Sequence, residues 1–122
     1  MVINWKNNNK TILRNFSENQ DLHDVVKILL MRMLRRNYPN SKKVSIYSEF
    51  CPEKPHTLYP DVYIDIEGKD KCVFEIQDKW SKDWEIKKAK QYEGIATLIV
   101  IKLNDMPSEI NKIKKRLEDY VI

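Results

Sequence analysis

The chain has 122 residues, of which 42% are hydrophobic, and a formal net charge of +4. This length predicts one domain, residues 1–122, with room for a single sheet and a few helices. The hydrophobic content and the presence of only two glycines exclude a disordered or loop-rich chain. The slight basic excess suits a polyanionic partner but does not require one, because a lysine-rich surface is often simply solvated.

No signal peptide and no apolar run long enough to span a bilayer is present. Cys51 and Cys72 lack a spacing motif, so we expect reduced thiols in an intracellular, cytoplasmic protein without a membrane partner. Zinc is disfavoured because Cys51, His56, Cys72 and His23 lack the paired spacing of zinc knuckles.

The first helix is the clearest local prediction. Residues 1–16 give no legible pattern, but Ser17 to Gln20 forms a capping box. A helix should then run to about Arg36 and end before Pro39, since its apolar residues recur at helical spacing: Leu22, Val25, Val26, Leu29, Leu30, Met33 and Leu34. A strand over residues 43–50 and a loop over residues 51–59 follow; the sequence does not decide whether Glu49 faces a site or the sheet edge.

Residues 59–79 form the stretch that organises the chain. Alternating apolar residues predict two strands joined by a turn at residues 68–70. In the second strand Glu75 and Gln77 share one face, about 6 to 7 Å apart. Asp61, at the start of the first strand, should meet Glu75 across the hairpin.

The remaining elements alternate between helix and strand. Ser81 can cap a helix that stops at Gly94. Residues 96–103 are nearly all apolar, which predicts a strand buried on both faces, central in the sheet and parallel to a neighbour. A last helix should open at Pro107, with a core stripe of Ile110, Ile113, Leu117 and Tyr120 or Val121.

Two converging carboxylates repel each other unless a cation lies between them. Their hard oxygens favour Mg²⁺ or Mn²⁺, which keeps several waters when bound. Such an ion suits phosphodiester hydrolysis, because it polarises the phosphoryl oxygen and acidifies a bound water.

The order Pro60-Asp61, about a dozen residues, then Glu75-x-Gln77 resembles the PD-(D/E)XK nuclease superfamily. The resemblance covers about residues 17–103. It implies an α/β, restriction-endonuclease-like core with a central mixed four-stranded sheet flanked by helices in the order α-β-β-β-α-β. The last helix is then an addition to this core. Small single-domain members include archaeal Holliday-junction resolvases, but their glycine-rich and basic N-terminal features are not evident here.

The resemblance assigns the metal ligands to Asp61, Glu75 and the backbone carbonyl of Ile76. Gln77 stands where the superfamily has lysine, and an amide can hydrogen-bond the attacking water but cannot take its proton. We rank Gln77 first for this role, Lys79 second and Lys88 third. A helix before the sheet often adds an acidic ligand in this superfamily, which favours Glu18 over Asp21. First-turn acids are also favoured by the helix dipole alone.

Basic residues after the hairpin predict a phosphate track. We assign nucleic-acid binding to Lys79, Trp80, Lys82, Lys87 and Lys88, because lysines hold a backbone while aromatic rings stack on bases. Trp84 is expected to pack against the sheet instead.

The sequence therefore predicts a magnesium- or manganese-dependent DNA endonuclease, selective for branched or single-stranded DNA, acting as a homodimer. The alternatives are a catalytically inactive nuclease fold that binds DNA or assembles with protein, and a protein-binding subunit without nucleic-acid affinity. The abundance of lysine, isoleucine and asparagine suggests an AT-rich genome of an archaeon or its virus, in which case the host cytoplasm is the expected location.

Overall fold

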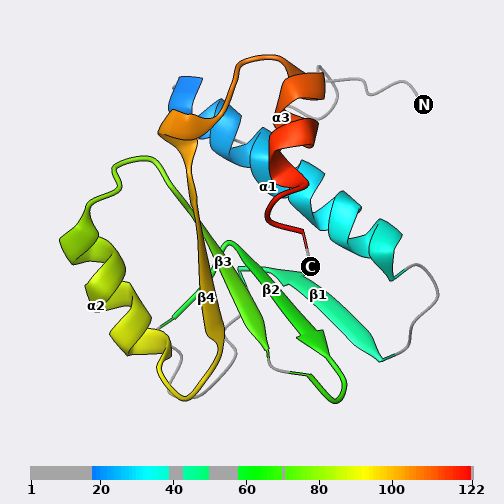
Figure 1. Cartoon of the computed structure of the whole chain (residues 1–122), viewed down its shortest axis with the longest axis vertical. Helices are drawn as coiled ribbons and strands as arrows, with labels where there is room; N and C mark the ends of the chain where they lie inside the picture. Colours follow the sequence, from blue (N-terminus) through cyan, green and yellow to red (C-terminus); the bar gives the residue numbers. More distant parts are fainter. Residues whose placement is uncertain (1–17, 39–42, 50–57, 70, 122) are drawn as a thin grey trace, which may run out of the picture.

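The computed structural model describes residues 18–38, 43–49, 58–69 and 71–121. Its elements follow the expected order (Figure 1): α1 (Glu18–Asn37), β1 (Val44–Ser48), β2 (Val62–Ile66), β3 (Cys72–Gln77), α2 (Lys82–Tyr92), β4 (Thr97–Lys102), the short 3₁₀ helix η1 (Leu103–Asp105) and α3 (Ile110–Leu117). The α/β class and the mixed four-stranded sheet are confirmed.

The strands lie in the order β1-β2-β3-β4, so each pairs with its neighbour in sequence. The β1–β2 and β2–β3 pairs are antiparallel, and β3–β4 is parallel. Helix α2 makes the crossover that a parallel pair requires. The Ser81 hydroxyl caps this helix by accepting a hydrogen bond from the Trp84 N–H, and Gly94, at φ +77°, turns the chain back toward β4.

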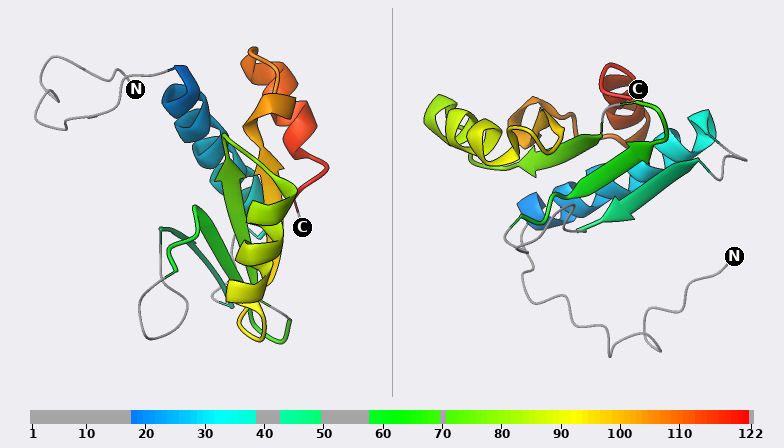
Figure 2. Two further views of the ribbon diagram at one scale, coloured as in Figure 1. Left: turned by 90° about the vertical axis from the view of Figure 1, so that its left-hand side faces the viewer. Right: turned by 90° about the horizontal axis from the view of Figure 1, so that it is seen from below.

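Strand alternation sends side chains to two separate packing layers. On one face, α1 and α3 lie side by side and cover the larger core (Figure 2). This core includes Val26, Leu30, Leu34, Val62, Ile64, Phe74, Ile76, Ile101, Ile113 and Leu117. On the other face, Tyr92 of α2 packs with Tyr63 and Val73. Thus Val73 and Glu75 of β3 point toward α2, whereas Gln77, at the end of the strand, borders a pocket together with His23 of α1.

Strand β4 is at the edge of the sheet, so the expectation of a central position was wrong, while its parallel pairing with β3 was right. The apolar run reflects helices on both faces rather than strands on both sides. Leu98 packs in the α2 layer, and Ile99 and Ile101 pack in the α1–α3 layer.

Helix α3 begins at Ile110 rather than at Pro107, because the backbone is still extended at its N-cap residue, Glu109. Ile113 and Leu117 are buried as expected, but Ile110 is 55% exposed. The predicted cap Ser17 and the residues Phe50, Cys51 and His56 lie outside the described part of the chain.

Candidate metal site

The two predicted acids lie where β2 and β3 separate. The last paired residues at this end are Val62 and Phe74, and one further step in the same register places Asp61 opposite Glu75. Beyond this point the Asp61 side chain reaches to β3, where its Oδ2 accepts a hydrogen bond of 2.7 Å from the Ile76 N–H. Burial is the main cause of the raised pKa of Glu75, and the Asp61 charge adds a smaller rise.

His23 of α1 is the second partner of Asp61. Its Nε2 lies 3.0 Å from Asp61 Oδ1, and its Nδ1 lies 3.4 Å from Asp24 Oδ1. The hydrogen bond to Asp61 raises the pKa of His23 above 6.5, against the opposing effects of burial and of Lys27. Helix α1 therefore contributes an imidazole that is hydrogen-bonded to Asp61.

Sequence reasoning considered His23 only as a poor zinc ligand and missed this contact. The available signal was its place on the helix, directly after Leu22 and three residues before Val26, at the polar edge of the core stripe. Glu18, the acid assigned to this helix, is its first residue, and its side chain lies outside the described part of the structure.

Glu75 is the buried acid of the pair, with an exposed fraction of 8%. Its Oε1 accepts a hydrogen bond of 2.8 Å from the hydroxyl of Tyr92, and the Lys88 Nζ lies 3.9 Å from the same oxygen. Burial raises the pKa of Glu75, while Tyr92 and Lys88 oppose that rise. Both opposing groups come from α2 and lie four residues apart on one face of it.

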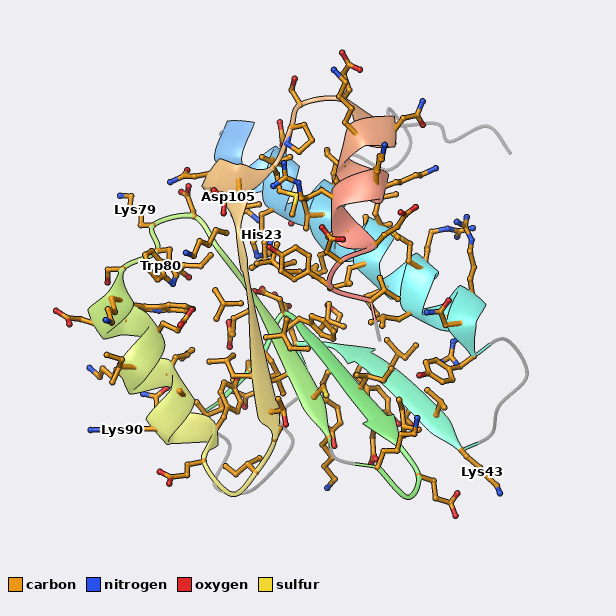
Figure 3. All side chains as sticks on the ribbon, viewed as in Figure 1. His23, Lys43, Lys79, Trp80, Lys90 and Asp105 are labelled. Carbon is orange, nitrogen blue, oxygen red and sulfur yellow. The ribbon has the colours of Figure 1, made fainter. Side chains whose placement is uncertain are left out.

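The three residues ranked for the role of the superfamily's lysine differ in their distance from the two acids. Lys88, ranked third from the sequence, is the one that approaches an acid. Lys79 is exposed, and Gln77 is half-buried and donates from Nε2 to the Lys79 carbonyl at 3.2 Å. Gln77 and Lys79 border a pocket of about 270 Å³ that is also lined by Gln20, His23, Ile76, Asp78 and Leu103. His23, Lys79 and Trp80 all lie toward this end of the sheet (Figure 3).

The sequence left open whether Glu49 faces a site or the sheet edge, and the structure shows it paired with Lys27 of α1. In the register of β1 and β2, Glu49 is the position beside Asp61, and its N–H donates to the Pro60 carbonyl at 3.0 Å. Its carboxylate is 3.7 Å from Lys27 Nζ and its side chain is 64% exposed. Glu49 has φ +53°, a backbone conformation that non-glycine residues adopt infrequently. It therefore belongs to the rim of the site.

The chemistry of the donors fits a hard divalent cation. Both Asp61 oxygens accept one hydrogen bond, but each carboxylate oxygen has a second lone pair. Among the described residues, no side chain hydrogen-bonds or forms an ion pair with Glu75 Oε2. The same residues contain no cluster of three or more aspartate, glutamate, histidine or cysteine side chains that could hold a metal ion. By residue type, two carboxylates and a backbone carbonyl are hard oxygen donors of the kind that Mg²⁺ accepts together with waters.

The residues assigned to nucleic-acid binding have different surroundings. Lys82 and Lys87 are exposed on α2, and Trp84 is half-buried. Trp80 donates from Nε1 to Glu85 Oε1 at 3.0 Å, and Lys102 Nζ lies 3.5 Å from its ring centroid. One face of the Trp80 ring is therefore covered by a cation from β4, which ties the β3–α2 connection to the edge strand.

Comparison with family models, curated proteins and solved structures finds no significant match. None of the helices in the described ranges combines the length and apolarity needed to cross a membrane.

Proposed function

We propose that this protein is a divalent-metal-dependent endonuclease of the PD-(D/E)XK type, which hydrolyses DNA phosphodiester bonds. The observation that carries the proposal is the register of β2 and β3, which sets Asp61 opposite Glu75, together with the hydrogen bond from the Ile76 N–H to Asp61 Oδ2. In a strand the N–H and C=O of one residue point to the same side. The Ile76 carbonyl is thus directed to the side on which Asp61 lies.

Asp61, Glu75 and the Ile76 carbonyl would hold Mg²⁺ or Mn²⁺. The bound ion would supply charge neutralisation at the phosphate and acidification of a water. The side chains around it have distinct roles in this proposal. His23 orients Asp61, Tyr92 orients Glu75, and the Lys88 ammonium adds a positive charge beside Glu75.

The Gln77 amide hydrogen-bonds water or phosphate but takes no proton. With no lysine at position 77, a bound ion would have to supply the acidification of the attacking water, and Lys88, 3.9 Å from Glu75, adds positive charge beside that acid. A two-fold dimer would bring two such sites to the two strands of one DNA molecule.

The test is cleavage of end-labelled single-stranded, duplex and branched DNA with Mg²⁺ or Mn²⁺. Asp61→Asn and Glu75→Gln are expected to abolish cleavage, since each removes a charge from the ligand set while keeping side-chain volume. Glu67→Gln, an exposed acid in the β2–β3 turn, is the matched control and should cut like the parent protein. Cleavage that persists in both site variants, or none by the parent on any substrate, would contradict the proposal.

A second candidate function is favoured by Gln77. If the lost lysine marks lost chemistry, the fold serves as a DNA-binding or assembly module. This candidate predicts DNA binding that is unchanged by Asp61→Asn and Glu75→Gln, without cutting. Binding to a protein partner instead would lack the steep salt dependence of phosphate contacts.

A further inference from the structure

The pocket beside the acids is built from three separate parts of the fold: the first turns of α1, the end of β3 with the residues that follow it, and η1. It shares two residues with the candidate metal site. His23 is hydrogen-bonded to Asp61, and Ile76 donates to the same carboxylate. A group in this pocket would therefore be adjacent to whatever Asp61 binds.

The lining of the pocket is amphipathic. Leu103 and Ile76 border the pocket as core residues, with exposed fractions of only 3% and 4%, so each offers a small apolar contact. Gln77 uses its amide nitrogen in a hydrogen bond to the Lys79 carbonyl, which leaves its Oε1 as an acceptor at the pocket edge. Lys79 is exposed and has no ion pair with any residue that the structure describes.

A small apolar surface, an amide acceptor and an exposed cation correspond to the three parts of a nucleotide: the base ring, the base edge and the phosphate. The ring of a base is apolar on its faces, its edge carries N–H donors, and its phosphate is anionic. Ligand pockets usually start at about 300 Å³, and about 270 Å³ is available here. That space is on the scale of one nucleobase.

We propose, on the basis of the proposed function, that this pocket binds one unpaired nucleotide next to the proposed metal site of Asp61 and Glu75. Gln77 contacts the base edge, and Lys79 contacts the adjoining phosphate. The protein then selects single-stranded DNA, or a single-stranded flap, over continuous duplex, because a paired base has to leave its stack to enter the pocket.

The experiment measures binding without metal, so that no cleavage is needed for a readout. Fluorescence anisotropy in EDTA compares three labelled probes: a single strand of about 12 nucleotides, the corresponding blunt hairpin duplex, and an abasic strand with the same length and charge. Variants Gln77→Leu and Lys79→Ala are compared with Lys69→Ala, an exposed lysine in the turn at the opposite end of β2. Thermal melts confirm that each variant is folded.

We expect the parent protein to bind the single strand about tenfold tighter than the duplex or the abasic strand. Gln77→Leu should reduce the preference for the base-containing strand over the abasic strand. Lys79→Ala should weaken binding to both strands, and Lys69→Ala should weaken binding to neither by more than about twofold.

Equal affinity for the base-containing and abasic strands would overturn the inference, as would equal affinity for single strand and duplex. The two proposals fail separately. Single-strand preference without cleavage in Mg²⁺ or Mn²⁺ removes the nuclease and leaves the nucleotide pocket, whereas cleavage of duplex as fast as single strand does the reverse.

Discussion

Replacement of Glu75 by glutamine should have opposite effects on the metal-free and the metal-bound protein. Glu75 is 8% exposed, and burial raises its pKa, so the folded protein holds this charge at a cost. Burial of a polar group costs about 1–3 kcal/mol, and Tyr92 and Lys88 offset part of that. The amide keeps the oxygen that accepts from Tyr92, so Glu75→Gln should stabilise the metal-free protein by about 0.5–1 kcal/mol, or about 3 °C in Tm.

The metal response should disappear in the same variant. A ligand that binds only the folded state, at ten times its Kd, adds about 1.4 kcal/mol to stability. Differential scanning calorimetry in EDTA and with increasing Mn²⁺ measures both effects, with Glu67→Gln as the control for loss of an exposed charge. A lower Tm of Glu75→Gln in EDTA, or a Mn²⁺-induced rise equal to that of the parent, would refute this account of the site.

Three further predictions concern the supports of the two acids and the turn before β4. The raised pKa of His23 means that the folded state binds the imidazole proton more tightly than the unfolded chain does. The free energy that the His23–Asp61 pair adds to folding is therefore fully present below pH 6.5 and declines as the pH rises through the folded-state pKa. Urea unfolding of His23→Ala should therefore show a loss of about 1–2 kcal/mol at pH 5.5 that shrinks at pH 8.5, and a loss that is the same at both would contradict it. Tyr92→Phe should cost about 1 kcal/mol by removing one buried hydrogen bond while keeping the ring; a further rise in the pKa of Glu75, followed by carboxyl NMR, is the accompanying signature. Gly94→Ala should cost about 1 kcal/mol in chemical denaturation because φ is +77° there, even though a methyl group would meet no atom within 4 Å; an unchanged midpoint would show that the turn relaxes.

The elements were predictable because local signals and packing agree. The stripe Val26, Leu30 and Leu34 gave α1 its length, and the alternation through Val62, Ile64 and Phe74 fixed which hairpin face is buried. The same alternation placed Asp61 and Glu75 on adjacent strands. These inferences need only the periods of helix and strand.

The contacts between distant segments were not predictable from such periods. The apolar sequence of β4 indicates contact with other parts of the protein but not whether these are helices on its two faces or strands on its two sides. The edge position of β4 was therefore not predicted. The pairing of His23 with Asp61 joins residues 38 positions apart and depends on how α1 crosses the sheet. Likewise, the choice of Lys88 rather than Lys79 depends on the rotation of α2 over Glu75.

The hydrogen bond from the Ile76 N–H gives Asp61 a structural role in addition to its proposed role as a metal ligand. Beyond the last β2–β3 pair, the Asp61 carboxylate accepts the Ile76 N–H in place of a backbone carbonyl. Loss of Asp61 would therefore remove a hydrogen bond between the two segments at this end of the hairpin, whether or not any reaction occurs there. Asp61 therefore has a structural role that does not depend on the proposed nuclease activity. Glu75 is a buried charge that costs stability, and its role in the proposed function is chemical alone.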